Sequence, residues 1–600
     1  MFRKISIIYI AVLLTCFYKA QSSNHAYYQE LIKTGLDSEE QIRIKTKKSY
    51  LFTFDMVKLH KELKKVSDVS KNNDAVLLTL PSPDGSTLTF ELVSNNVMHP
   101  NLAKKFHDVM TFDAYEINDP SIKAKLDLTP HGFHAMILRN GHSTIFIDPY
   151  LKSNNSQYIS YAKEDFITDK SMKCEFSGKI DIAKMKIKQA NNAKSFGTCE
   201  LRTYRLALAA TGEYTSYHGG TLALAQAAQV TTMNRVNGIF ERDMAITMQI
   251  IPNNDLIIYT NASSDPYTNG SPGAMINENQ NTVNSVIGSA NYDIGHVFGT
   301  NSGGLAGLGV VCSNFSKARG VTGSANPIGD PFDVDYVSHE MGHQFGANHT
   351  FNNSCSGNRN DPTAIEPGSG NTIMAYAGIC APNTQSLSDD HFHGISLEEI
   401  EIEILSGGHS CPVITPLTNN APVISSTNGN VTIPANTPFA LTAIATDPDG
   451  DQLTYNWEQI NNDITTQPPL STSTGGPNFR SNPSLTSPTR YFPNLTDLAN
   501  GGPFTWEVIP SVSRTMDFRV IVRDNALGGG CNDHADVTIS TDAGSGPFVL
   551  TYPSASGITW AATSTETITW NVANTDNAPV NCTNVDLLLS IDGGATFSPL

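Results

Sequence analysis

The spacing of apolar residues divides this 600-residue chain into regions with different secondary structure. Residues 21–190 alternate apolar and polar positions with a period of two, which is typical of half-buried β-strands. The alternation is clearest in STLTFELV, AKLDLT, FHAMILR and STIFIDPY. We therefore expect a β-rich domain at the N-terminal end.

From residue 196 to residue 411, predicted strands and helices alternate, which indicates an α/β domain. Strands are expected in LRTYRLALAAT, MAITMQIIP, DLIIYT and the glycine-interrupted run GLAGLGVVC, residues 304–312. Helices are expected in HGGTLALAQAAQVTTMNRVNGIFERD, GAMINENQNTVNSVIG and ISLEEIEIEIL. PFDVDYVSHEMGHQFG is also predicted to be helical, because Val334, Val337, Met341 and Phe345 form one apolar face.

After Cys411 the composition predicts a linker, PVITPLTNNAPVISS, followed by all-β modules. Short strands separated by Gly, Pro and Asn are typical of β-sandwiches. They are expected in FALTAIA, LTYNWEQ, MDFRVIVRD, ADVTIS and ETITWNV. The last segment, NVDLLLSIDGGATFSPL, has the pattern of a β-hairpin without partner strands, so we expect the native chain to continue beyond Leu600.

The first 20 residues have the features of a secretion signal, with Arg3 and Lys4 ahead of a short apolar run. An uncleaved anchor is the alternative, and no later segment is predicted to cross a membrane. The lysine-dotted stretch SGKIDIAKMKIKQANNAKSFG is either a processing site behind a pro-region or an ordinary linker. A net charge of −18 without a basic stripe excludes nucleic acid as the expected partner.

One short stretch, HEMGHQFGANH, carries three histidines and a glutamate. On a helix, His339 and His343 lie one turn apart and present two imidazoles to one ion. Gly346 allows the helix to stop with a positive φ, so that the chain turns back and His349 becomes a third ligand. Three histidines with a fourth position left for water are typical of catalytic zinc, and the sequence therefore predicts a zinc site.

Glu340 follows the first predicted ligand and is expected to lie beside the metal rather than on it. There its carboxylate can take a proton from the attacking water and pass it to the leaving amine, as a general base and then a general acid. The predicted reaction is hydrolysis of an amide bond.

The pattern HExxHxxGxxH followed by NTIMAYAGIC resembles the signature of the metzincins. Residues 199–411 are most similar to the reprolysin-like (adamalysin-type) metallopeptidases, particularly bacterial secreted ones with trailing Ig-like modules. The resemblance implies a zinc endopeptidase with Met374 beneath the zinc ligands. It also implies that residues 304–311 form an edge strand that pairs with an extended substrate. The residues expected to do this are Gly304, Leu305, Ala306, Gly307 and Leu308.

The chain departs from the reprolysin pattern at two places. Thr350 follows the third histidine where reprolysins usually have aspartate, which puts the support of the zinc site in doubt. Tyr376 resembles the tyrosine of astacin-like and serralysin-like enzymes, where it can stabilise the oxyanion. The alternative is a buried aromatic residue that supports the methionine turn.

An even number of cysteines in an exported chain favours disulfides, and none has the CxxC spacing of a zinc knuckle or redox site. The family resemblance implies that Cys312 pairs with Cys411 and Cys355 with Cys380. Cys174 either pairs with Cys199 or places a thiolate on the zinc as a latency switch. Excluding Cys16 of the signal, the cysteines are Cys174, Cys199, Cys312, Cys355, Cys380, Cys411, Cys531 and Cys582.

Three further patterns were considered as functional sites. Two of them have both a structural and a functional interpretation, and the third has no predicted function. The segment DPDGD aligns Asp447, Asp449 and Asp451, which indicates either a solvated turn or a weak Ca2+ site. Trp457 and Trp506 are either core residues or sugar-binding platforms. SDDHFH, residues 388–393, is predicted to be a polar loop leading into a helix, without a functional role.

The sequence thus predicts an exported zinc endopeptidase made as a zymogen and acting on protein or peptide substrates. Two alternatives remain. One is a surface adhesion protein whose Ig-like modules bind surface proteins or glycans, and the other is a zinc hydrolase of small amides, which would need a closed pocket. The predicted segments are a signal (1–20), a pro-region (21–190), a metzincin-like domain (196–411), an Ig-like or cadherin-like sandwich (420–545) and a second, incomplete sandwich (546–600).

Overall fold

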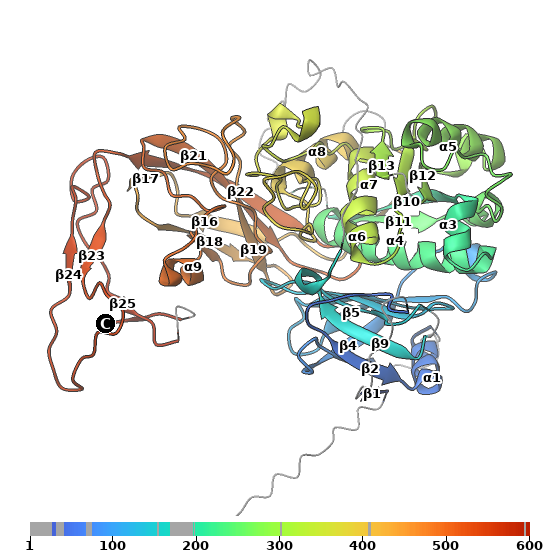
Figure 1. The fold of residues 1–600 in the computed structure, drawn as a ribbon, viewed down its shortest axis with the longest axis horizontal. Helices are drawn as coiled ribbons and strands as arrows, with labels where there is room; N and C mark the ends of the chain where they lie inside the picture. Colours follow the sequence, from blue (N-terminus) through green and yellow to red (C-terminus); the bar gives the residue numbers. More distant parts are fainter. Residues whose placement is uncertain are drawn as a thin grey trace, which may run out of the picture.

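The computed structural model describes residues 27–31, 41–67, 75–152, 155–168, 196, 199–300, 303–405, 410–592 and 596–600. The predicted signal, Cys174 and nearly all of the lysine-dotted stretch lie outside these residues. Figure 1 shows a multidomain protein, with an N-terminal β-sheet beneath an α/β domain and a β-sandwich to one side. Among the helices described, none is both long and apolar enough to pass through a bilayer.

The N-terminal domain is built on one antiparallel sheet with the strand order β1-β2-β9-β8-β7-β6-β5-β4-β3. The four segments predicted to be strands here correspond to β4, β6, β7 and β8. The elements are β1 Tyr28–Glu30, β2 Tyr50–Phe54, α1 Met56–Ser67, β3 Val76–Pro81, β4 Thr87–Ser94, α2 Pro100–Ala103, β5 Met110–Glu116, β6 Lys123–Thr129, β7 Gly132–Leu138, β8 Ile145–Pro149, β9 Gln157–Ala162 and η1 Lys163–Asp165.

Both faces of this sheet are covered. Successive side chains of a strand point to opposite faces, so Leu126 of β6 enters a core that includes Leu59 and Leu63 of α1. On the other face, Met136 of β7 and Phe146 of β8 belong to the core of the α/β domain. The N-terminal sheet is therefore a layer between α1 and the next domain.

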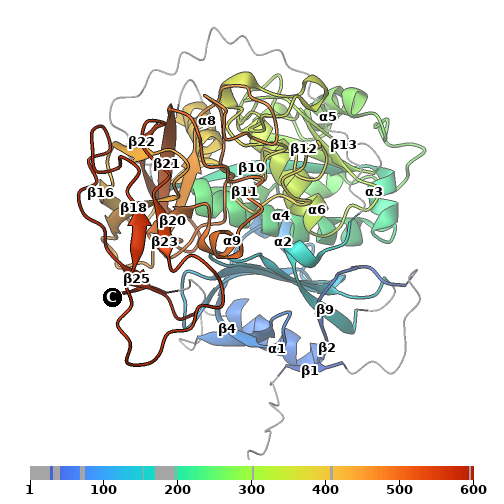
Figure 2. The same ribbon diagram turned by 60° about the vertical axis from the view of Figure 1, so that its left-hand side comes forward.

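The α/β domain contains a mixed sheet with the order β11-β10-β12-β14-β13, in which β10, β11, β12 and β14 are parallel. Strand β13 lies at the edge, antiparallel to β14. Figures 1 and 2 show α4 between this sheet and the N-terminal sheet. The elements are β10 Glu200–Ala210, α3 Gly212–Tyr217, α4 Leu222–Met244, β11 Ile246–Ile250, η3 Asn254–Ile257, α5 Pro272–Val286, η4 Ser289–Asn291, β12 Ile294–Gly299, β13 Gly303–Ala306, β14 Gly320–Gly323 and α8 Gly394–Leu405.

Two strand predictions in this domain are wrong at least in part. DLIIYT begins with the 3-10 helix η3, because the Asn254 side chain accepts from Leu208 N at 2.8 Å and donates to Leu208 O at 2.9 Å in place of a strand partner. The run 304–312 is a strand only as far as Ala306. Gly307 and Leu308 lie beyond it, where Gly309 turns the chain with φ +59° and donates to His343 O at 2.9 Å.

The predicted linker after Cys411 is also wrong at its start. Val413–Pro416 forms β15, which pairs antiparallel with β10 and so completes the α/β sheet. Two further sheets, β16-β18-β20 and β17-β22-β21-β19, follow and share one core. Their elements are β16 Val423–Thr427, β17 Val431–Pro434, β18 Phe439–Thr446, β19 Thr454–Gln459, β20 Thr489–Phe492, α9 Leu495–Asn500, β21 Arg514–Arg523 and β22 Asn532–Asp542.

The C-terminal segment leaves the sandwich as two small hairpins, visible at the left of Figure 1. β23 (Val549–Tyr552) pairs with β24 (Thr569–Asn571). β25 (Leu588–Leu589) pairs with β26 (Ser598–Pro599), which confirms the hairpin predicted there.

Disulfides connect Cys312 with Cys411 and Cys355 with Cys380, as predicted. Cys199 pairs with Cys531 of the sandwich, so the predicted alternative of a bond to Cys174 is wrong. The two cysteines are 332 residues apart in the sequence, so proximity along the chain gave no guide to this bond.

Candidate metal centre

The segment with the predicted metal ligands is helical from Asp330 to Gln344. It comprises α6 (Asp330–Phe332), the π-helical turn η5 (Asp333–Ser338) and α7 (His339–Gln344), and we call it the zinc helix. Pro331 in its first turn suits a helix start. At its end Gly346 has φ +100° and Ala347 N donates to Gly342 O at 3.0 Å, so the chain turns back as the sequence predicts.

The turn brings His349 to the two histidines of the zinc helix. His343 Nε2 lies 3.1 Å from His339 Nε2 and 3.1 Å from His349 Nε2. Each Nδ1 faces a backbone carbonyl oxygen: that of Ile373 for His339 at 2.7 Å, Ala347 for His343 at 2.7 Å and Asn358 for His349 at 2.6 Å. The Nδ1 atoms are thus the protonated ones, and the Nε2 lone pairs converge on one point.

This arrangement fits zinc. A tetrahedral ion that holds nitrogen at about 2.0–2.1 Å needs ligand atoms roughly 3.3 Å apart, close to the distances found. Burial, together with the neighbouring His339, lowers the pKa of His349 to about 3, and burial likewise lowers the pKa of His343 well below its usual value. The imidazoles of His343 and His349 are therefore neutral near pH 7, the form in which imidazole binds a metal.

Glu340 is buried beside these histidines, and the edge strand passes directly over it. A Cβ built on Gly304 of β13 would lie 1.8 Å from Glu340 Oε1, so only glycine fits at this position. The strand and the carboxylate are consequently in direct contact. Of the residues predicted for the edge strand, Gly304, Leu305 and Ala306 are in β13, whereas Gly307 and Leu308 are not.

Met374 and Tyr376 both lie against the metal centre. A Cβ added to Gly342 of the zinc helix would be 2.5 Å from Met374 Sδ, which places the methionine under the helix. The Tyr376 ring is buried, with its centroid 4.6 Å from that of His349 and 4.4 Å from that of Phe351. Tyr376 is thus near the ligands, as both of its interpretations require.

Thr350 stands where an aspartate would usually support the third histidine, and a different carboxylate, that of Glu366, lies beside it. Glu366 was not among the residues predicted from the sequence. Thr350 Oγ1 donates to Glu366 Oε1 at 2.6 Å, and the hydroxyl of Thr372 donates to the same oxygen. Glu366 Oε2 accepts from Asn371 N at 2.7 Å and Thr372 N at 3.1 Å. A buried carboxylate from a neighbouring loop therefore connects the third histidine to the methionine turn. The only hint in the sequence is that few acidic residues occur between His349 and Met374.

The other candidate sites are simpler. The carboxylates of Asp447, Asp449 and Asp451 lie within 4.8 Å of one another. Asp447 Oδ1 accepts from Asp449 N at 2.8 Å and Asp451 N at 3.1 Å, as in an ordinary turn. Trp457 is buried in the sandwich core, which confirms its structural interpretation, and Trp506 is half-buried against Gly368.

Three convergent imidazoles with an adjoining glutamate define a metal-dependent hydrolase centre of the metzincin type. Residues 200–396 match the family model described as metallo-peptidase family M12B, reprolysin-like. This segment is a reprolysin-like zinc metalloendopeptidase domain, and the match covers the zinc helix, the edge strand and the methionine turn. A search of curated proteins found no match to the chain.

Proposed function

We propose that the protein is a secreted zinc endopeptidase in which Glu340 is the general base. The observation that carries the proposal is the convergence of three histidine Nε2 atoms beside a buried glutamate that touches an edge strand. Disulfide bonds are consistent with an oxidising compartment outside the cell.

His339, His343 and His349 would hold zinc through their Nε2 atoms. When bound, zinc polarises the scissile carbonyl and lowers the pKa of water. Glu340 takes a proton from the attacking water and returns it to the leaving amine. The backbone carbonyls at the three Nδ1 atoms fix the ring orientations, so each imidazole is already oriented before the metal ion binds.

The edge strand favours peptides over small amides as substrates. Among the described strands, β13 pairs with β14 alone, and the backbone groups of Gly304, Leu305 and Ala306 on the outer side can pair with an extended chain. Main-chain pairing holds peptides of many sequences in register beside Glu340. We propose that Tyr376 donates its phenol to the negative charge that develops on the carbonyl oxygen.

The remaining parts of the chain have proposed roles as well. Residues 420–545 are proposed to be an Ig-like or cadherin-like module and residues 546–600 part of a second one, which bind surface proteins or glycans. Asp447, Asp449 and Asp451 form either a solvated turn or a weak Ca2+ site, and calcium titration of the full chain distinguishes the two.

The decisive experiment is cleavage of casein and of quenched peptides by the full chain and by Glu340→Gln. We expect the variant to keep one zinc per chain but to lose activity by about 10²–10⁴-fold, the range for a lost general base. Glu62→Gln, on the surface of the N-terminal domain, is the matched control. If Glu340→Gln cleaves as fast as the parent, Glu340 is not the base, and hydrolysis of small amides but not peptides would favour the alternative hydrolase.

A further inference from the structure

The sequence predicts a removable pro-region ahead of the protease, but the N-terminal domain and the α/β domain share one core. Met136, Phe146 and Tyr161 from the N-terminal sheet lie in the same cluster as Met233 of α4 and Val334 of the zinc helix. The α/β sheet itself extends into the N-terminal domain. Ile250 N donates to Val97 O at 2.8 Å, and His99 N donates to Ile250 O at 2.9 Å, so residues 97–99 pair alongside β11.

Helix α4 has buried polar side chains on the face that meets the N-terminal sheet. Thr231 Oγ1 donates to Asp127 Oδ1 at 2.8 Å, and Asn234 Nδ2 donates to Leu126 O at 2.9 Å. Glu241 forms an ion pair with Lys125. The N-terminal domain supplies these partners, and a buried polar group that loses its partner is costly.

The strongest link is Lys163, at the end of the N-terminal sheet. Its Nζ lies 2.9 Å from Asp330 Oδ1, 3.1 Å from Asp335 Oδ1 and also against Asp390. Lys163 is 5% exposed, so this contact is buried. Burial alone would lower the pKa of Lys163, but the three acidic side chains hold it well above its usual value, so the lysine is charged. Burial, together with the neighbouring Asp335 and Asp390, raises the pKa of Asp330 well above its usual value, so the cluster depends on Lys163 to hold its acidic groups together.

The three carboxylates belong to two segments that frame the metal centre. Asp330 and Asp335 are in the first turns of the zinc helix, ahead of His339. Asp390 is in the loop 388–393, where His391 O accepts from Ile373 N at 3.1 Å beside Met374. One cation from the N-terminal domain therefore holds the zinc helix and the methionine turn together. SDDHFH, for which the sequence predicts no role, is this connecting loop.

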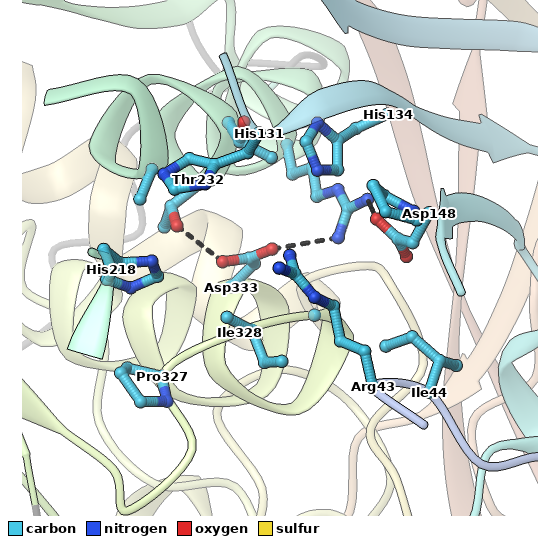
Figure 3. A pocket seen from close by; sticks show the side chains of 15 residues that line it. Arg43, Ile44, His131, His134, Asp148, His218, Thr232, Pro327, Ile328 and Asp333 are labelled. Carbon is cyan, nitrogen blue, oxygen red and sulfur yellow. Dashed lines mark hydrogen bonds and ion pairs between the residues drawn. The ribbon is translucent and has the colours of Figure 1, made fainter. Parts of the chain in front are cut away.

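A second set of buried ion pairs also connects the N-terminal sheet with the zinc helix. Arg235 of α4 bonds Asp148 of the N-terminal sheet at 2.6 Å and Asp333 of the zinc helix at 3.0 Å. Figure 3 shows Asp148 and His134 on one side of a cavity and Asp333 and Thr232 on another. The cavity of about 40 Å³ is large enough for a few water molecules but too small for a larger ligand, so it is a small gap within the interface.

We propose that the N-terminal domain is a permanent part of the enzyme, and that Lys163 is a positioning residue for its metal centre. If the chain is cut between residues 169 and 195, the two parts stay together. Removal of the domain would leave Asp330, Asp335 and Asp390 buried without their cation, which is strongly unfavourable. This inference rests on one part of the proposed function, namely that the three histidines bind zinc.

The first test compares the full chain with Lys163→Met, which removes the charge at similar length. Lys105→Met is the matched control, because Lys105 also crosses the interface, to Asp255 at 2.7 Å, but is 46% exposed at its side chain. Zinc affinity is measured by chelator competition, with kcat, KM and thermal unfolding alongside. We expect Lys163→Met to bind zinc at least about tenfold more weakly and to lose kcat more than KM changes, while Lys105→Met stays within about twofold.

Two further variants separate positioning from general stability. Adding Asp330→Asn and Asp390→Asn to Lys163→Met removes the excess charge, and we expect zinc affinity to recover in part. A lower melting temperature with unchanged zinc affinity would overturn the positioning role. If the wild type binds zinc but cleaves no peptide, the proposed function fails, whereas the comparison of zinc affinities still judges Lys163.

The second test does not depend on a variant that folds. The wild-type chain is nicked by trypsin and examined by native size-exclusion chromatography and mass spectrometry. We expect any fragment that ends between residues 169 and 195 to co-elute with the zinc-containing remainder and to separate only in denaturant. Isolation of stable, zinc-loaded and active protein without residues 27–168 would overturn the proposal.

Discussion

At the scale of single residues, Glu366 supplies a carboxylate next to the third histidine that the HExxHxxGxxH segment itself does not contain. Its two oxygens receive hydrogen bonds from Thr350, Asn371 and Thr372, and its side chain is almost fully buried. Hydrogen bonds to a carboxylate are stronger than those to a neutral amide. The charge of Glu366 therefore stiffens the loop between the third histidine and Met374.

We predict that Glu366→Gln lowers zinc affinity by about 10–100-fold, because an amide cannot accept all four of these hydrogen bonds. The peptide KM should change less than kcat. Chelator competition and steady-state kinetics measure the two effects, with Glu30→Gln as an exposed control. Unchanged zinc binding in Glu366→Gln would show that the methionine turn does not need this support.

The ligand set could be predicted from sequence because His339, Glu340, His343 and His349 lie within one helix and one turn. Their relative positions follow from local spacing, whereas the orientation of the His339 ring also depends on the more distant Ile373 carbonyl. Glu366 and Lys163 could not be predicted in this way, since each acts on residues that only the tertiary fold brings near it. The same holds for Gly304, whose contact with Glu340 joins a strand to a helix.

At the scale of elements, the end of the zinc helix decides where the third ligand lies. Gly346 has φ +100°, and an added Cβ would be 3.0 Å from that of Glu403. Gly501 ends α9 in the same manner, with φ +74° and open space around it. A substitution strains the backbone at either glycine, but only Gly346 precedes a metal ligand.

We predict that Gly346→Ala and Gly501→Ala both lower the free energy of unfolding, by about 1–3 kcal/mol each from the left-handed backbone. Only Gly346→Ala should also weaken zinc binding, by about tenfold or more, because the strained turn of this variant would move His349 away from the other two histidines. Denaturant unfolding of the metal-free protein and chelator competition test this. Equal zinc affinity in the two variants would contradict the dependence of His349 on the turn.

The edge strand gives a prediction about the substrate. Each main-chain hydrogen bond to β13 contributes about 0.5–1.5 kcal/mol, so its loss should lower kcat/KM by roughly 2- to 12-fold. We therefore expect peptides N-methylated at alternate residues on one side of the cleaved bond to be poorer substrates. Methylation at the intervening residues, whose amides point away, is the control. Equal effects at all positions would argue against strand pairing.

Elements with a regular spacing of apolar residues could be predicted well from the sequence. Elements whose ends are determined by tertiary hydrogen bonds could not. α4 was predicted to be helical by its composition, but its polar residues gave no sign that a second sheet covers it. The strand expected in DLIIYT failed because one side chain, Asn254, replaces the backbone partner. The strand expected over residues 304–312 ended early because Gly309 and Val310 donate to carbonyls at the end of the zinc helix.

At the scale of the whole molecule, the domain order was predictable but the coupling of the domains was not. β15 returns to the first strand of the α/β sheet, and Cys199 bonds Cys531 of the sandwich. Arg523 of the sandwich bonds Asp243 at the end of α4 at 3.0 Å, and Phe392 N donates to the same carboxylate at 3.0 Å. Sandwich, α/β domain and the loop 388–393 therefore meet at one buried charge.

This charge makes the interface sensitive to acid. Although burial opposes ionisation, Arg242 and Arg523 lower the pKa of Asp243 to about 2. An unfolded aspartate titrates near about 3.9, so the stabilisation is fully present above that pH and is lost as the pH falls through 2. The shift corresponds to about 3 kcal/mol of pH-dependent stability, of which about 2 kcal/mol is lost by pH 2.

We predict that Asp243→Asn lowers the free energy of unfolding by about 3–5 kcal/mol at pH 7, since it leaves Arg523 buried without its counter-ion. The difference from wild type should narrow by about 2 kcal/mol between pH 5 and pH 2, because the wild-type carboxylate is then protonated as well. Asp536→Asn, which removes a half-exposed partner of Arg519, should cost less than about 1 kcal/mol. Denaturant unfolding across this pH range measures all three proteins, and a difference for Asp243→Asn that stays constant with pH would show that the carboxylate does not hold the domains together.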